Sequence, residues 1–276
     1  MKKVCLVISL SLLLVIIAPS SVISAAPKKS SLGNTLIADT LNNRVIEVDS
    51  SGNIVWSFSE GLNYPRKAKR LQNGHTLITD TKNNRVLKVN RRGKVVWSYI
   101  STNQIASALP LPKGNVLIAP GFPENRVFEI NARGEIVWQL TSGLHFPTDA
   151  ERLPNGNTLI ADTDNARVIE VDATGTIVWS YGGLWHPHDV DRLANGNTLI
   201  VNSGQSVIEV NPSGSVVWQM VLTGAEDADR LPNGNTLITA GPPYRVIEVD
   251  PGQNVVWEYG ADLGGAGDAE RLSTKK

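Results

Sequence analysis

Apolar and polar residues alternate in short segments along this chain, and the same order of segments returns about every 40 residues. The best-preserved copy spans 149–181 and reads DAERLPNGNTLIADTDNARVIEVDATGTIVWSY. Four stretches in it (DAERL, TLIAD, VIEVD and IVWSY) are separated by turns rich in Asn and Gly. Alternation with β-branched residues predicts strands, and short glycine-containing turns predict hairpins. Each repeat is therefore expected to form a four-stranded antiparallel meander.

Tryptophan marks the last strand of every repeat. A period near 40 residues is typical of architectures in which each unit buries its apolar face against its neighbours. A large ring at the same point of every outer strand is expected to wedge between neighbouring blades, which is a structural role. Apart from the N-terminal segment, no stretch shows a helical apolar period. The separations are 41, 41, 41, 39 and 39 residues for Trp56, Trp97, Trp138, Trp179, Trp218 and Trp257.

The two ends of the repeat region complement each other. The first repeat begins at its TLIAD segment with no DAERL before it, whereas GDAERL recurs at 267–272 after the last tryptophan. A ring whose C-terminal strand completes the first blade explains this arrangement, and closure removes exposed sheet edges. We therefore predict an all-β, six-bladed β-propeller of four-stranded antiparallel blades over residues 31–272, followed by a short tail at 273–276.

Residues 1–25 have the order of features found in secretory signal peptides. Lys2 and Lys3 precede an apolar run, and small residues follow it near Ala25. The run is shorter than the roughly 20 residues that cross a bilayer. We predict a signal peptide, a tether at 26–30, and a secreted, periplasmic or cell-surface location. Retention as an uncleaved N-terminal anchor is the alternative.

Charge and cysteine content narrow the range of partners. The chain carries 26 basic and 26 acidic residues, whereas a nucleic-acid-binding protein usually shows a strongly basic face. Binding to nucleic acid or to anionic lipid is therefore not expected. The single cysteine, Cys5, lies in the predicted signal peptide, so the mature domain is expected to have no disulfide. We expect a monomer.

The repeats resemble known propeller families over 31–272. The stretches DTLNNRVIEVD and DTKNNRVLKVN, from Asp39 and Asp80, are similar to the NHL repeat. VDATGTIVWSY, ending at Tyr181, resembles the tryptophan-bearing repeat of PQQ-type quinoprotein propellers. LPNGNTLIADT together with IVWSYGG is similar to the six-bladed propellers of bacterial arylsulfotransferases. Such signatures encode blade geometry more than function. Quinoprotein dehydrogenases usually have eight blades and a vicinal cysteine pair, so quinone binding is not implied.

The first position of the innermost strand differs among repeats. Four repeats have aspartate there, whereas the second and third have Lys67 and Ser107. Carboxylates that converge near an axis repel one another unless they are paired or neutralised. Pairing with the arginines three residues further on (Arg152, Arg192, Arg230 and Arg271) is the favoured interpretation. The alternative is Ca²⁺, which prefers several carboxylate oxygens, bound by Asp149, Asp189, Asp227 and Asp268.

An arginine also recurs directly before the third strand of five repeats. An arginine at the same position in five repeats indicates a structural role rather than five active sites. We expect inter-blade salt bridges or carbonyl contacts from Arg44, Arg85, Arg126, Arg167 and Arg245.

The loops that lead into the inner strands differ most among the repeats. Three of them read GLNYP, GLHFP and GLWHP, and they place aromatic or imidazole side chains directly before a proline. Such loops normally open on one face of a propeller around the channel mouth, where convergent polar groups form ligand sites. The alternative is that the aromatic residues only fill gaps between blades. The candidate ligand-binding residues are Tyr64, Arg66, His145, Trp185, His186, His188 and Glu226.

Two functions fit these features. The first is an exported binding or scaffold propeller whose channel mouth holds a protein, peptide, glycan or small-molecule ligand. The second follows from the arylsulfotransferase resemblance, which implies that a channel histidine transfers a sulfuryl group between phenols. His188 is then the candidate nucleophile and Arg66 the anion contact. Because the inner-strand carboxylates would repel a sulfate, we predict binding without catalysis.

Overall fold

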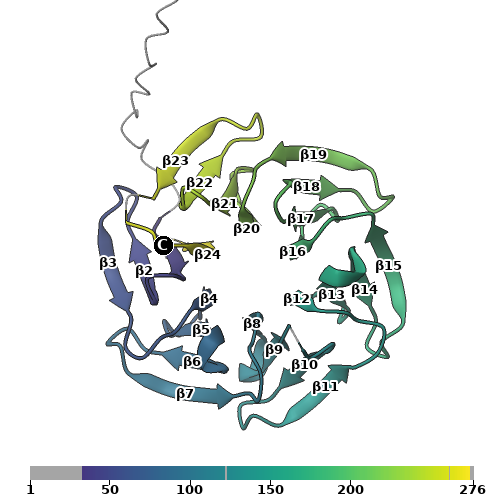
Figure 1. Ribbon diagram of the computed structural model, residues 1–276, viewed down its shortest axis with the longest axis horizontal. Helices are drawn as coiled ribbons and strands as arrows, with labels where there is room; N and C mark the ends of the chain where they lie inside the picture. The colour runs from purple at the N-terminus through teal and green to yellow at the C-terminus, as the bar shows by residue number, and fades with distance from the viewer. Residues whose placement is uncertain (1–32, 122, 261, 274–276) are drawn as a thin grey trace, which may run out of the picture.

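The computed structural model describes residues 33–121, 123–260 and 262–273, which form six four-stranded antiparallel sheets around a common axis (Figure 1). The predicted six-bladed β-propeller is confirmed. The predicted signal peptide, the tether and residues 274–276 lie outside the described residues. Within the part that is described, no helix has the length and apolar character needed to cross a membrane.

Each blade contributes one strand to each of four concentric positions. The innermost strands are β4 (Pro65–Arg70), β8 (Ser107–Pro110), β12 (Pro147–Arg152), β16 (Pro187–Arg192), β20 (Ala225–Arg230) and β24 (Ala266–Arg271). The second strands are β1 (Thr35–Asp39), β5 (Thr76–Asp80), β9 (Val116–Ala119), β13 (Thr158–Asp162), β17 (Thr198–Asn202) and β21 (Thr236–Ala240). The third strands are β2 (Arg44–Val48), β6 (Arg85–Val89), β10 (Val127–Ile130), β14 (Arg167–Val171), β18 (Ser206–Val210) and β22 (Arg245–Val249). The outer strands are β3 (Ile54–Phe58), β7 (Val95–Ile100), β11 (Ile136–Leu140), β15 (Ile177–Gly182), β19 (Val216–Val221) and β23 (Val255–Tyr259).

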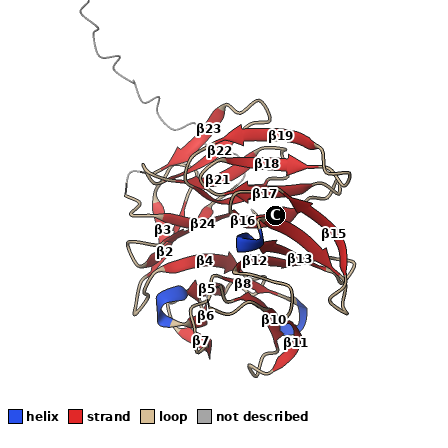
Figure 2. Cartoon of the chain, turned by 45° about the vertical axis from the view of Figure 1, so that its right-hand side comes forward, coloured by secondary structure: helices blue, strands red, loops and turns tan. Residues whose placement is uncertain are grey.

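Helical structure is confined to single turns in the described residues. Figure 2 shows them in blue at the loops. They are the 3₁₀ helices η1 (Thr81–Asn83), η2 (Pro112–Gly114) and η3 (Thr163–Asn165). The expectation of an essentially helix-free propeller therefore agrees with the structure.

The ring closes between the two ends of the repeat region. Strand β24 pairs antiparallel with β1, so that Thr35 lies opposite Arg271. Backbone hydrogen bonds from Thr40 N to Gly265 O and from Leu272 N to Asn34 O extend the pairing on both sides. Blade 1 therefore consists of β24, β1, β2 and β3, with its innermost strand taken from the C-terminal end (Figure 1).

The apolar core lies between blades rather than within them. One cluster joins Leu36 and Val45 of blade 1 to Ile78 and Leu87 of blade 2, and all four side chains are at most 1% exposed. The second strands read as continuous apolar runs because both of their faces are covered. A single repeat cannot bury these faces alone, so the interfaces between blades hold the fold together.

The tryptophans connect neighbouring blades, as their spacing suggests. The indole Nε1 of Trp56 donates a hydrogen bond to the carbonyl of Arg91 in the next blade, and Trp138 bonds Ala173 in the same way. A guanidinium lies over most of these rings, for example that of Arg152 at 4.5 Å from the Trp138 ring centre. Most of the indoles are partly buried, whereas Trp257 is 1% exposed.

The arginines at the ends of the inner strands do not pair with the inner-strand aspartates, so that prediction is wrong. Each bonds a glutamate on the third strand of the preceding blade, for example Arg152 to Glu129 at 3.2 Å. Alternation along the strand explains the difference, because it turns Arg152 to the side opposite Asp149 and Glu151. The other pairs are Arg70–Glu47, Arg192–Glu170, Arg230–Glu209 and Arg271–Glu248.

The arginines before the third strands also differ from the expectation of inter-blade salt bridges. Arg85 Nε lies 2.6 Å from Asp80 Oδ2 in its own blade, because the two residues are opposite each other in the β5–β6 pairing. The expected carbonyl contact is present, since Arg85 Nη2 donates to Gly61 O at 2.7 Å. This pattern repeats in blade 4 with Arg167, Asp162 and Gly143.

Candidate functional site

Four buried aspartates form a ring near the start of the inner strands. Each uses one carboxylate oxygen to accept a backbone N–H from the inner strand of the next blade. The Oδ2 atom of Asp268, for example, lies 2.9 Å from Ala68 N. These hydrogen bonds tie neighbouring inner strands together across the blade boundaries. The ring consists of Asp149, Asp189, Asp227 and Asp268, none more than 3% exposed.

Two lysines from blade 2 contact the other oxygens of this ring. Lys67 Nζ lies 2.6 Å from Asp189 Oδ1 and 3.1 Å from Asp149 Oδ1. Asp227 Oδ1 lies 3.6 Å from the same ammonium. Lys69 Nζ lies 3.2 Å from Asp268 Oδ1. The counter-charge of the ring thus comes from blade 2, one of the two blades that lack the aspartate.

Calcium binding at the four aspartates stays a prediction. Among the residues that the structure describes, no group of three or more His, Cys, Asp or Glu side chains is arranged to hold a metal ion. The Lys67 ammonium already contacts three of the carboxylates. A calcium ion would have to displace this ammonium to reach the oxygens.

Opposing effects set the pKa values in the ring. Burial lowers the pKa of Lys67, but attraction to the four aspartates outweighs it and holds that pKa well above its usual range. Burial, together with repulsion from Asp268 and Asp189, raises the pKa of Asp227 well above normal. The lysine is therefore charged, and the surrounding carboxylates are held in close mutual repulsion.

A second acidic layer lies at the other end of the inner strands, which we call the exit mouth (Glu151, Asp191, Asp229 and Glu270). These residues line a depression of about 550 Å³ together with the following turns. Burial is the main cause that raises the pKa values of Glu151 and Glu270 to about 7. Asp191 has its pKa raised well above normal by burial and by repulsion from neighbouring carboxylates.

The exit mouth should make folding stability depend on pH. The pKa values of Glu151 and Glu270 rise from 4.5 to about 7 on folding, so their protonated forms favour the folded state. The resulting stability is present below about pH 4.5 and is lost as pH rises toward 7. We expect the double substitution Glu151→Gln with Glu270→Gln to stabilise the protein at pH 8 relative to pH 5, by roughly 1–3 kcal/mol.

Urea unfolding of the wild type and the double variant at pH 5, 6, 7 and 8 measures this effect. Glutamine keeps the oxygen that accepts the backbone N–H of Arg192 or Arg70. The difference between the two proteins also cancels the titration of groups elsewhere. A difference in unfolding free energy that stays constant from pH 5 to pH 8 would contradict the prediction.

The start of the inner strands brings together three of the predicted site residues, a group we call the entry cluster (Arg66, His188 and Glu226). Arg66 Nη2 lies 2.5 Å from His188 Nε2, and His188 Nδ1 lies 3.3 Å from Glu226 Oε2. Arg66 Nη2 also lies 3.6 Å from the Glu226 carboxylate. These residues come from β4, β16 and β20, whose starts meet around the axis.

His188 in this cluster is a neutral imidazole. Burial and the adjacent Arg66 charge lower its pKa well below the usual value. Its Nδ1 lies 3.2 Å from the carbonyl oxygen of Glu226, which can only accept, so Nδ1 carries the proton. Its Nε2 lone pair then accepts from Arg66. The imidazole is thus held on both sides and fixes the direction of the guanidinium.

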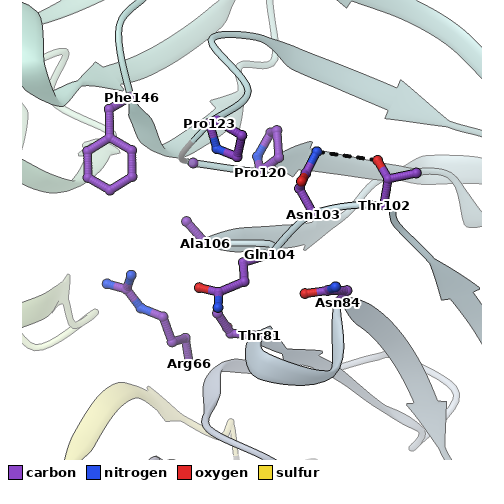
Figure 3. A pocket seen from close by; sticks show the side chains of 11 residues that line it. Arg66, Thr81, Asn84, Thr102, Asn103, Gln104, Ala106, Pro120, Pro123 and Phe146 are labelled. Carbon is purple, nitrogen blue, oxygen red and sulfur yellow. Dashed lines mark hydrogen bonds between the residues drawn. The ribbon is translucent and has the colours of Figure 1, made fainter.

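A pocket of about 420 Å³ opens beside Arg66, between blades 2 and 3, and we call it the side pocket (Figure 3). Figure 3 shows Arg66, Gln104 and Asn84 on one side and Phe146 with Pro120 on the other. The lining residues are Arg66, Thr81, Asn84, Thr102, Asn103, Gln104, Ala106, Pro120, Gly121, Pro123 and Phe146.

The side pocket lies where blade 3 departs from the repeat. In blades 2 and 4 an aspartate ends the second strand and accepts an N–H from the incoming linker, as Asp80 does from Asn63 and Asp162 from His145. Pro120 follows β9 at the equivalent place in blade 3, and its side chain accepts no hydrogen bond. The linker before β8 consequently lacks this attachment, and the pocket opens beside it.

The other predicted residues lie around the entry cluster or further out. Tyr64 lines a smaller pocket of about 150 Å³ with Arg66 and Glu226. The rings of His186 and His188 are stacked with centroids 6.4 Å apart. His145 Nδ1 lies 3.3 Å from Asp164 Oδ2, and the other oxygen of Asp164 lies 3.8 Å from His186 Nε2. Trp185 is 72% exposed. The structure therefore groups Tyr64, His186 and the entry cluster, connects His145 to His186 through Asp164, and leaves Trp185 apart.

Sequence reasoning missed the side pocket and the role of Lys67. Phe146, Gln104 and Asn84 were not among the candidates. A signal for the pocket was present, since Pro120 replaces the aspartate that ends the second strand in blades 1, 2 and 4. The sequence therefore showed that blade 3 lacks the side-chain acceptor that other blades have at the end of the second strand.

Comparison with known proteins gives one family and several similar folds. A family model described as outer membrane protein assembly factor BamB matches residues 41–188 and 124–272, which together span most of the chain. No curated protein matches the sequence.

Solved structures with similar folds differ widely in sequence. A protein of unknown function from Bacteroides caccae is 18% identical with a TM-score of 0.74, over 87% of this chain and 98% of that chain. A functionally unknown protein from Desulfotomaculum acetoxidans is 12% identical with a TM-score of 0.67, over 88% and 100%. Virginiamycin B lyase from Staphylococcus aureus is 12% identical with a TM-score of 0.62, over 86% and 85%. At these identities the likeness concerns the fold alone.

Proposed function

The chain belongs to the propeller family described as outer membrane protein assembly factor BamB, and from this premise we propose that it is an exported binding or scaffold protein. Its ligand or partner is held at the entry cluster and the side pocket. The observation that carries the proposal is the convergence of Arg66, His188 and Glu226, three residues that break the repeat, beside a polar pocket.

Export is the second part of the proposal. The predicted signal peptide at 1–25 supports it, and the name of the matched family refers to the outer membrane. We propose a periplasmic or outer-membrane-associated location. The balance of 26 basic and 26 acidic residues supports a partner other than nucleic acid.

Sulfuryl transfer through His188 is the alternative function. A neutral imidazole beside an arginine is the arrangement that such a nucleophile needs. In this chain, however, the Nε2 lone pair of His188 accepts from Arg66, so it is not free to attack a sulfuryl group. Virginiamycin B lyase has a similar fold but is only 12% identical, so its activity is not assigned to this chain. We therefore place binding before catalysis.

Binding at the entry cluster should depend on its charged residues. We expect small carboxylates, sugars or short peptides that bind the wild type to raise its melting temperature by about 5 °C near saturation. The double substitution Arg66→Ala with Glu226→Ala should abolish the shift. Differential scanning fluorimetry against a panel of such compounds measures it.

A matched control is the ion pair Arg133–Glu135, which is remote from the inner strands and exposed. Replacing both of its residues with alanine should leave the ligand-induced shifts unchanged. Shifts that persist in the Arg66/Glu226 variant would contradict the proposal. The same protein should not turn over a nitrophenyl sulfate with a phenol acceptor. His188-dependent turnover would favour the enzyme instead.

A further inference from the structure

We propose that the side pocket binds a carboxylated sugar, with the carboxylate on Arg66 and the ring hydroxyls on the amides opposite Phe146. This inference rests on the proposed function, because it names the class of ligand that the entry cluster and the side pocket would bind. Three features of the pocket support it: an oriented guanidinium with free donors, uncommitted primary amides, and a fixed aromatic wall.

Arg66 offers the charged contact. Its Nη2 is committed to His188 and Glu226. Its Nε and Nη1 groups make no hydrogen bond or ion pair with any residue that the structure describes. A guanidinium presents its N–H groups as a planar fork that matches the two oxygens of a carboxylate. Since the His188 contact already fixes the side chain, little conformational freedom is lost when an anion binds.

The polar wall offers groups that both donate and accept. The side-chain amides of Asn84 and Gln104 form no hydrogen bond within the described part of the chain, and both line the pocket together with Arg66 (Figure 3). Asn84 is held at φ 52°, and its backbone N–H donates to Thr81 O at 3.0 Å. A primary amide can serve as donor and acceptor at once, as vicinal hydroxyls require. A fully ionised inorganic anion such as sulfate offers acceptors only, so it would leave the amide oxygens of Asn84 and Gln104 without a donor.

The apolar wall is held in place by its backbone. Phe146 has φ 51°, an uncommon conformation for an aromatic residue, and its N–H donates to Asn125 Oδ1 at 2.9 Å. A side chain at Gly121 would approach the Phe146 ring at 3.2 Å, so the glycine leaves room for that ring. A fixed aromatic face suits the C–H face of a sugar ring, which is apolar and flat. The cavity of about 420 Å³ falls in the range of small-ligand sites.

The local charge is compatible with an anionic ligand. Glu124 follows the lining residue Pro123 in the chain, and its carboxylate accepts from Arg126 Nε at 2.5 Å and from Asn103 Nδ2 at 2.8 Å. These partners lower the pKa of Glu124 against the effect of burial and balance its charge. The carboxylate of the ligand would therefore meet Arg66 without a facing unpaired anion.

Isothermal titration of the purified protein with D-galacturonate and D-glucuronate tests the inference. We expect a uronate to bind at least ten-fold more tightly than the matching neutral sugar, D-galactose or D-glucose. Arg66→Gln should erase this preference, and Gln104→Ala should weaken uronate binding several-fold. Arg133→Gln, which removes an exposed guanidinium elsewhere, should leave binding unchanged. Thermal melts of each variant confirm that the fold is intact.

The two proposals fail in different ways. Equal affinity for uronate and neutral sugar, or an Arg66→Gln variant that keeps the uronate preference, would overturn the sugar inference. If the uronates do not bind but an acidic tripeptide binds in an Arg66-dependent way, the region around Arg66 is a binding site and only the proposed ligand class is wrong. If no tested probe depends on Arg66, both proposals fall.

Discussion

Replacing Lys67 with methionine is expected to destabilise the propeller by about 3–5 kcal/mol, because it leaves buried aspartates without their counter-charge. The Lys67 ammonium contacts Asp149, Asp189 and Asp227 within 3.6 Å. Removing one partner of a buried ionic group costs far more than removing a surface charge. Methionine keeps most of the side-chain volume, so the loss reports charge more than packing.

The pH dependence separates charge from packing in this variant. Protonation relieves the repulsion among the aspartates, so the loss caused by Lys67→Met should be larger at pH 8 than at pH 5. Urea unfolding at both pH values measures it. Lys94→Met, at an exposed turn, should change stability by less than about 0.5 kcal/mol. A loss of the same size at both pH values would show that Lys67 acts through its methylene groups.

The blade architecture could be predicted from the sequence because every repeat carries the same signals. The alternation in strands such as β14 and the turns that contain glycine specify local structure, and six copies in register leave few ways to assemble them. The tryptophan at one point of each outer strand fixed the number of blades. Closure through β24 could be inferred from the DAERL segment near the C-terminal end.

The contacts across the axis could not be predicted in the same way. The alternation along an inner strand sends Asp149 and Arg152 to opposite sides, yet nearness in sequence suggested that they pair. Lys67 was visible as an exception to the repeat, but its reach to blades 4, 5 and 6 depends on the diameter of the ring. Such long-range placement is a property of the closed structure and not of any one repeat.

In the candidate site, too, the sequence identified individual residues but not the pocket that the packing of neighbouring blades creates. Arg66, His188 and Glu226 were identified because they differ from their counterparts in other blades, and the structure places them in contact. The side pocket forms where blade 3 has Pro120 in place of the aspartate that holds the linker in blades 2 and 4. An absent contact between a linker and a strand end has a visible consequence only when the neighbouring blade is in place.

The closing strand gives the second large effect. Ending the chain after Gly265 removes β24, which should expose the edge of β1 and lower the melting temperature by about 10 °C or more, or cause aggregation. The truncation removes the Asp268 contact with Ala68 N in blade 2 and the Arg271–Glu248 ion pair with blade 6. Both interfaces of blade 1 are therefore weakened at once, and the ring opens at the point where its two ends meet.

Thermal melts with light-scattering detection measure the effect of this truncation. A chain that ends at Ser273 keeps β24 and serves as the control, with a melting temperature expected to match the wild type. A synthetic peptide spanning 264–273, added to the truncated protein, should pair with β1 and restore part of the lost stability. Restoration by the peptide would show that the loss comes from the missing strand rather than from a general defect in folding. A truncated chain that melts at the wild-type temperature would contradict closure through β24.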